Sequence, residues 1–151
     1  QATQFLKDLN THAHSFSPSW STAYGLFKNK NADVVLSYIT SPIYHLVEEN
    51  DSNYQALEFK EGLPVQVEFM GLLASCKNCE AASKFISFVQ SKDGQRIIMK
   101  KNYMLPMDKQ ITEGTAFDTL RVFKLLDFKV YSKEEINKWL RIWSDIRKND
   151  G

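Results

Sequence analysis

The stretch PSWSTAYGLFKNKNADVVLSYITSPIYHLVEE, from Pro18 to Glu49, decides the fold that we predict. Within it, the apolar run DVVLSY (Asp33 to Tyr38) has adjacent β-branched residues and is typical of a strand covered on both faces, as in a parallel sheet. Helix starts flank this run, because Ser19 precedes one amphipathic segment and Thr40-Ser41-Pro42 places a capping hydroxyl before a proline. The order helix, strand, helix predicts an α/β fold.

The same stretch predicts a ligand site at the end of the strand. A strand that leads directly into a helix start brings free backbone N–H groups to the carboxyl edge of the sheet, where anions bind. Aromatic residues gather nearby, namely Trp20, Tyr24, Tyr38 and Tyr44. Rings and N–H groups together suit a ligand with a flat or cationic part and an anionic tail. The alternative for any single aromatic residue is packing on an amphipathic helix.

Three motifs carry a family resemblance. SWSTAYGLF (residues 19–27), ADVVLSYITSPIYHLVEE (residues 32–49) and the spaced pattern N-Y...F.EG..VQVE (residues 53–68) resemble the carboxyl half of periplasmic thiamine-binding proteins, the receptors of bacterial thiamine ABC importers. The match extends well over residues 19–89 and loosely beyond. The resemblance implies a type II periplasmic-binding-protein fold whose two lobes close on thiamine, its monophosphate or its diphosphate, and no other cofactor. It also implies a periplasmic location and an inner-membrane permease as partner.

The resemblance also implies which residues touch the ligand. Trp20, Tyr38 and Ser41 are expected at the phosphate end, and Tyr44 in the ring-binding part of the cleft. Asn102 and Tyr103 stand where the family has an asparagine-tryptophan pair that supplies a ring. Tyrosine stacks with less area and weaker cation–π attraction than indole. The full set of expected ligand contacts is Trp20, Tyr38, Ile39, Thr40, Ser41, Tyr44, Asn102 and Tyr103.

The length of 151 residues corresponds to one domain. A two-lobed receptor ordinarily needs two domains of roughly 100 to 150 residues each, so we expect a single α/β domain over residues 1–151 that is the C-terminal fragment of such a receptor. Residues 15–60 are expected in the ligand-binding lobe, 61–69 form a candidate hinge crossover, and 70–151 form a helical C-terminal portion. Glu68 is then either a cleft or hinge carboxylate or a solvated one on a surface strand.

Local patterns predict further elements along the chain. Two short runs favour strands, Tyr54–Phe59 and Val65–Leu73. Helices are expected over Thr3–Ala13, over Glu80–Gln90, and after the capping box Ser132-Lys133-Glu134-Glu135 as far as Lys148. Ser91-Lys92-Asp93-Gly94-Gln95 resembles the S-x-x-G-Q sequence with which solute-binding receptors end one helix and begin another. The run Phe117–Tyr131 is ambiguous between strand and helix.

Cys76 and Cys79 form a C-x-x-C pair and are the only two cysteines. Such a pair is half of a zinc site, a redox pair or a local disulfide. Zinc lacks further ligands at suitable spacing, and an oxidising periplasm favours a disulfide, with two ordinary thiols as the next alternative. His12 and His14 do not share a helix face, so we expect no metal site.

Composition and missing motifs limit the function classes. With 43% hydrophobic residues and a net charge of +1, nothing indicates a nucleic-acid surface or disorder. No apolar run approaches the ~18 to 20 residues of a transmembrane helix. Phosphate-binding glycine loops and common hydrolase motifs are missing. We therefore predict a binding protein and not an enzyme. The alternatives are a receptor of the same fold for a polyamine or ferric ion, and a thiamine-degrading enzyme similar to thiaminase I.

Overall fold

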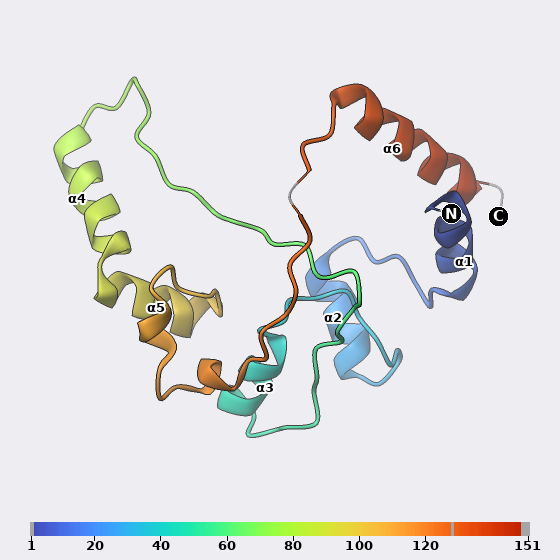
Figure 1. Ribbon diagram of the computed structural model, residues 1–151, viewed down its shortest axis with the longest axis horizontal. Helices are drawn as coiled ribbons and strands as arrows, with labels where there is room; N and C mark the ends of the chain where they lie inside the picture. The colour runs from blue at the N-terminus through green and yellow to red at the C-terminus, as the bar shows by residue number, and fades with distance from the viewer. Residues whose placement is uncertain (1, 128, 149–151) are drawn as a thin grey trace. The chain divides into compact units, whose positions relative to one another are not determined.

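The computed structural model describes residues 2–127 and 129–148. Its α-helices are α1 (Ala2–His12), α2 (Trp20–Lys28), α3 (Ser41–Glu48), α4 (Cys79–Gln90), α5 (Lys92–Asn102) and α6 (Lys133–Lys148) (Figure 1). Two 3-10 helices follow α5, η1 (Lys109–Thr112) and η2 (Ala116–Thr119). The helices expected near Thr3, Trp20, Glu80 and Ser132 are all confirmed, with ends within one residue of the expected positions.

The chain divides into two compact units. The first comprises residues 1–37 and 128–151 and contains α1, α2 and α6. The second comprises Tyr38–Asp127 and contains α3, α4, α5, η1 and η2. Of the residues expected to bind ligand, Trp20 belongs to the first unit, and the others, from Tyr38 to Tyr103, belong to the second.

Side-chain caps begin two helices of the first unit. Ser19 accepts a hydrogen bond from the Thr22 N–H at 3.2 Å and caps α2. The predicted capping box of α6 is confirmed, since the Glu135 N–H donates to Ser132 Oγ at 3.1 Å and the Ser132 N–H donates to Glu135 Oε2 at 2.9 Å. The latter hydrogen bond holds the pKa of the Glu135 carboxyl below its usual value.

Contacts between distant parts of the sequence hold α1 and α6 together in the first unit. Arg147 donates to Asn10 Oδ1 at 2.9 Å and places its guanidinium 4.3 Å from the ring centre of Phe16. Phe16 in turn meets Trp143 edge-on, with ring centres 5.2 Å apart. A hydrogen bond thus connects α6 to α1, and aromatic and cation–π contacts connect α6 to the segment that follows α1.

The core of the second unit is small. Ile43, Met99, Ile111 and Phe117 form one buried cluster, which joins α3, α5, η1 and η2. Met99 is the most buried of them, with 1% of its surface exposed. These four side chains fix the position of α3 relative to the end of α5.

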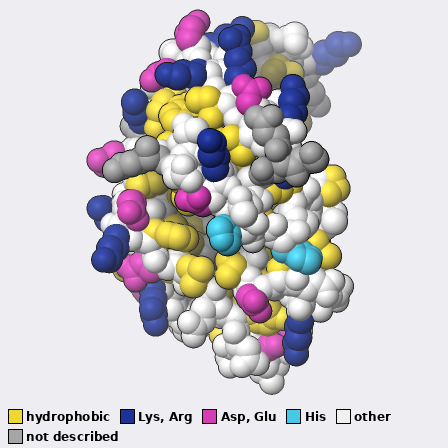
Figure 2. Space-filling view, turned by 90° about the vertical axis from the view of Figure 1, so that its right-hand side faces the viewer, with side chains coloured by type: hydrophobic (Ala, Val, Ile, Leu, Met, Phe, Trp, Pro, Cys, Tyr) yellow, Lys and Arg dark blue, Asp and Glu magenta, His cyan; other side chains and the backbone are white. Residues whose placement is uncertain are grey.

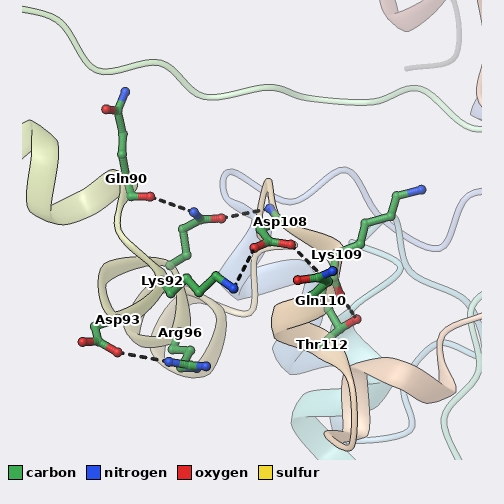
Figure 3. Close-up of polar contacts among 9 residues, drawn as sticks. Gln90, Lys92, Asp93, Arg96, Asp108, Lys109, Gln110 and Thr112 are labelled. Atoms are coloured by element: carbon green, nitrogen blue, oxygen red, sulfur yellow. Dashed lines mark hydrogen bonds and ion pairs between the residues drawn. The ribbon is translucent and has the colours of Figure 1, made fainter.

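A compact polar junction connects α4, α5 and η1 in the second unit (Figure 3). Ser91 caps α5 by accepting from the Gly94 N–H at 3.2 Å. The Gln95 amide bridges two segments, because its Nε2 donates to Gln90 O at 2.8 Å and its Oε1 accepts from the Asp108 N–H at 3.1 Å. Lys92 lies 3.7 Å from the Asp108 carboxylate. The S-x-x-G-Q sequence therefore has a structural role here.

The predicted strands are wrong for this structure. Among the described residues, no strand forms at residues 33–38, 54–59 or 65–73, and Figure 1 shows the latter two runs in the coil between α3 and α4. The first of these runs is not covered on both faces, because Val34 and Leu36 are 65% and 93% exposed. A strand needs a neighbouring strand to pair its N–H and C=O groups. The described residues supply no such ladder for these runs.

Many large apolar side chains consequently remain at the surface. They include residues of the expected strands, such as Val67 at 61% and Phe69 at 91% exposure. On the face drawn in Figure 2, hydrophobic side chains reach the surface between acidic and basic ones. The apolar content of the sequence therefore exceeds what this chain buries on itself.

One isolated parallel bridge joins Leu63 to Leu125 in the second unit. The Leu63 N–H donates to Lys124 O at 2.8 Å, and the Leu126 N–H donates to Leu63 O at 2.9 Å. Gly62 makes this approach possible: its φ is 110°, and a Cβ atom there would lie 2.9 Å from Lys124 O. The ambiguous run from Phe117 thus begins as η2 and continues as extended chain, and Phe128 lies outside the described residues.

Cys76 and Cys79 are joined by a disulfide, with Cα atoms 5.4 Å apart. Cys79 is the first residue of α4, so the bridge ties the first turn of that helix to the preceding loop. Within the described residues, no helix is both long enough and apolar enough to span a bilayer.

Candidate ligand-binding site

Two helix ends of the second unit bring an aromatic pair and a carboxylate together. Tyr44 and Glu48 are four residues apart and share one face of α3. The Tyr103 ring meets the Tyr44 ring edge-on, with ring centres 5.4 Å apart, and the Tyr103 hydroxyl donates to Glu48 Oε1 at 2.7 Å. Phe117 stacks on Tyr103, with ring centres 6.0 Å apart. We call Tyr44, Glu48, Tyr103 and Phe117 the Tyr103 cluster.

The backbone at Tyr103 turns the ring toward α3. Tyr103 follows the last residue of α5 and has a left-handed conformation with φ 52°. This region is unfavourable for a bulky residue, so the surrounding packing must hold it. The ring packs against the core of Ile43, Met99, Ile111 and Phe117. The core thus determines where Tyr103 lies.

The hydroxyl of Tyr103 remains a donor over the physiological pH range. Its pKa is raised to about 12, first by burial and then by the hydrogen bond to Glu48, the charge of that carboxylate and Tyr44. A protonated hydroxyl next to a carboxylate forms a charge-assisted hydrogen bond, which is stronger than one between neutral groups. The hydrogen bond therefore holds the Tyr103 ring in one orientation, with the Glu48 carboxylate beside it.

The contacts of His45 next to Tyr44 were not predicted from the sequence. His45 is fully buried and stacks on Tyr54 with ring centres 3.5 Å apart and planes 9° apart. Its Nδ1 lies 2.6 Å from Glu49 Oε2, and the imidazole N–H donates to the carboxylate. The Tyr44 ring lies edge-on to His45 at 5.4 Å. A histidine four residues before a glutamate on a helix was the available signal.

The expected anion site at the start of α3 needs correction. Thr40 is the N-cap residue, it is buried, and its side chain makes no cap hydrogen bond. The Ser41 N–H donates to Tyr38 O at 3.0 Å and the Ile43 N–H donates to Thr40 O at 3.0 Å. Pro42 has no N–H. The free N–H groups predicted here are therefore engaged within the turn. Thr40, and not Ser41, occupies the N-cap position, because the helix begins at Ser41.

Trp20 belongs to the first unit. Its indole N–H donates to Ser37 Oγ at 3.0 Å, and its ring stacks on Tyr24 at 4.9 Å. Half of its surface is exposed. Ser37 directly precedes Tyr38 in the chain. The hydrogen bond therefore fixes the Trp20 ring next to the backbone that leads into the predicted site.

The structure brings together only part of the predicted set. Tyr44 and Tyr103 are in ring contact. Tyr38 is 59% exposed, and Asn102 directs its amide to Met104 Sδ at 3.0 Å. Among residues 2–127 and 129–148, no group of three His, Cys, Asp or Glu side chains is placed to hold a metal ion.

The sequence and the fold have counterparts among known proteins. The chain matches the family of bacterial extracellular solute-binding proteins over residues 1–120, which is most of its length. It therefore belongs to that family of ligand receptors.

Particular relatives are similar over much of the chain. The thiamine-binding periplasmic protein of Haemophilus influenzae is 35% identical over 140 residues, which are 91% of this chain and 42% of that protein. Its counterpart in Escherichia coli is 40% identical over 119 residues, or 79% of this chain and 36% of that protein. A solved periplasmic thiamin binding protein matches with a TM-score of 0.82 at 34% identity, covering 97% of this chain and 46% of that one.

These comparisons confirm the resemblance, the α/β type II periplasmic-binding fold and the periplasmic location that the sequence predicts. The chain spans less than half the length of each relative named here. The backbone of this chain is similar to that of the solved relative, although the runs expected as strands do not pair with one another among the described residues.

Proposed function

We propose that this chain is the C-terminal part of a two-lobed receptor that binds thiamine and its phosphate esters and delivers them to an ABC importer. The observation that supports this most is the Tyr103 cluster, in which two tyrosine rings meet next to a carboxylate. Thiamine has two flat rings, one of them cationic, and aromatic faces attract such cations. The relatives that match are named for binding this vitamin.

The phosphate end of the ligand is assigned to the start of α3. The predicted contacts there are Tyr38, Ile39, Thr40 and Ser41, with Trp20 as a further contact. The N–H groups of Ser41 and Ile43 bond within the turn, and the proposed phosphate contacts are therefore the side chains of this segment. Replacing Trp20 by alanine is expected to weaken binding of the phosphorylated forms more than of free thiamine, and an equal loss for all forms would remove Trp20 from the phosphate end.

The crossover between lobes is assigned to residues 61–69. Gly62 and Leu63 lie against Lys124–Leu126 through the parallel bridge. Two passages of the chain therefore run side by side at this point, as a crossover between lobes requires. Residues 15–60 would then contribute to the ligand-binding lobe and residues 70–151 to the helical C-terminal portion.

Binding, and not turnover, is the proposed activity. A thiaminase-like mechanism needs a cysteine thiolate as nucleophile. Cys76 and Cys79 are joined to each other, so neither sulfur is a thiolate in this state. The related proteins are named as binding proteins.

The experiment is a tryptophan-fluorescence titration of the natural polypeptide that contains these 151 residues. Thiamine, thiamine diphosphate and spermidine are added separately, and ferric citrate serves as a fourth ligand. We expect saturable quenching by both thiamine forms at micromolar concentrations or below, and none by spermidine or iron. A folded protein that responds to spermidine or iron instead would assign the fold to a different ligand.

A further inference from the structure

We propose that Glu48 determines the ligand specificity of the Tyr103 cluster: its carboxylate positions the Tyr103 ring and places a negative charge beside it, so that the site selects flat ligands that carry a positive charge. This inference rests on the proposed function and adds a residue that the sequence-based set of contacts does not contain. It requires that Glu48 be held close to the ring, that its charge be retained, and that the ring be accessible.

The geometry meets the first requirement. Glu48 is the last residue of α3 and lies one helical turn after Tyr44, so its side chain and the Tyr44 ring are neighbours on one face. The contact to the Tyr103 hydroxyl, at 2.7 Å, joins residues that are 55 positions apart in the sequence. Phe117 stacks on the Tyr103 ring. The ring is therefore held by two contacts, Phe117 packing and the carboxylate at its hydroxyl.

The chemistry meets the second requirement. Tyr103 donates to the carboxylate, and a hydroxyl whose pKa is raised does not release its proton at neutral pH. The neutral Tyr103 hydroxyl thus positions the Glu48 carboxylate without placing an opposite charge beside it. A lysine or arginine partner would neutralise the charge of the carboxylate, whereas a tyrosine leaves it available to a ligand.

Exposure meets the third requirement. Tyr44 is 37% exposed, and both oxygen-bearing groups of the Glu48 and Tyr103 pair lie in an exposed contact. A flat cation against these rings would gain cation–π attraction and attraction to the carboxylate together. A neutral ligand of the same shape would gain only the stacking. The carboxylate therefore contributes selectivity and not only affinity.

The test compares thiamine with an analogue in which a neutral thiophene ring replaces the thiazolium ring. Their dissociation constants are measured by calorimetry on the natural polypeptide and on its Glu48→Gln variant. Glutamine keeps an oxygen that accepts from Tyr103 but removes the charge. We expect the preference for thiamine over the neutral analogue to fall about fivefold in Glu48→Gln, an effect that salt diminishes in the natural protein and not in the variant.

Glu58→Gln is the matched control, because Glu58 is an exposed carboxylate of the same unit and the substitution changes the net charge equally. We expect it to leave the preference unchanged. A second readout follows the ionisation of Tyr103 by ultraviolet absorbance, as the difference from Tyr103→Phe. Glu48→Gln is expected to lower this pKa, because the hydrogen bond to the carboxylate and its charge both raise it in the natural protein.

The outcomes separate the two proposals. If the natural protein binds thiamine and Glu48→Gln keeps its preference, the role of Glu48 is disproved while the proposed function stands. The same conclusion follows if the natural protein binds both compounds equally. If the folded natural protein binds neither compound, the proposed function is wrong and the role of Glu48 is overturned with it.

Discussion

Two parts of the second unit, the core beneath the Tyr103 cluster and the run of residues 65–73, differ in how deeply their apolar side chains are buried. The Tyr103 cluster is built on a core in which Met99 and Ile43 are 1% and 3% exposed. The run of residues 65–73 leaves Phe69 and Leu73 at 91% and 77% exposure. Helices bond their own backbone and need only side-chain partners, whereas extended chain needs a neighbouring strand as well. The buried apolar cluster of the second unit therefore lies where its helices pack together.

Substitution of Met99 tests the packed side of this comparison most strongly. Met99→Ala is expected to lower the free energy of unfolding by about 2 to 5 kcal/mol, because a buried side chain leaves a cavity. Urea unfolding followed by circular dichroism measures the loss. Met107→Ala is the matched control, since Met107 is 86% exposed, and similar losses for both variants would contradict the core as described.

Gly94 tests the junction of α4 and α5. A Cβ atom at this position would lie 2.1 Å from Phe88 O and 2.8 Å from Val89 Cα, both backbone atoms. Gly94→Ala is expected to destabilise by about 1 to 3 kcal/mol through this overlap. Gly25 lies inside α2 with no atom within 4 Å of the added Cβ. Gly25→Ala is therefore expected to stabilise by roughly 0.5 to 1 kcal/mol, and thermal melts of both variants should move in opposite directions.

The pH dependence of stability reports on Tyr103 directly. Its pKa is about 12 in the folded protein and about 10 in an unfolded chain. The unfolded state therefore loses its proton first, so this contribution to stability is complete below pH 10 and disappears as the pH rises to 12. Urea midpoints measured across this range should fall less steeply in Tyr103→Phe. Equal slopes in the two proteins would show that the hydroxyl is not held as described.

The smallest effect is expected in the extended run. Phe69→Ser is predicted to change the free energy of unfolding by no more than about 0.5 kcal/mol, because this side chain is almost fully exposed. The measurement is the urea midpoint of the 151-residue chain. A loss comparable to that of Met99→Ala would show that the run packs against a partner, and the contrast between the two regions would no longer hold.

The sequence predicted what depends on neighbours along the chain. Ser19 and the Ser132 capping box begin their helices where expected, since those hydrogen bonds reach only three residues ahead. The strands at residues 33–38 and 65–73 were predicted from side-chain patterns, but a strand depends on a partner that pattern analysis does not identify. The N-cap of α3 was predicted at Ser41, but Thr40 occupies it. The Ser41 and Ile43 N–H groups bond to carbonyl groups within the turn, which the side-chain pattern does not show.

The candidate site divides in the same way. Tyr44 and Tyr103 were expected at the ligand rings because of the resemblance; the structure shows that their rings are in contact, and their role in binding stays a prediction. Glu48 and His45 were not predicted, because their contacts form only when the chain folds. Glu48 contacts Tyr103, which is 55 positions away, and His45 stacks on Tyr54 beyond the end of its helix. Charged and titratable residues beside an aromatic pair were therefore the least predictable part of the site.

Glu68 has a consequence for the fate of the newly made chain. It is the only charged residue in the run VQVEFMGLL, and its carboxylate accepts from Gln66 Nε2 at 3.3 Å. A run that is β-prone, apolar and exposed promotes aggregation between copies, and a single charge within it opposes such stacking. We therefore expect Glu68 to oppose aggregation of this run, so that its replacement by an uncharged residue lowers the yield of soluble protein.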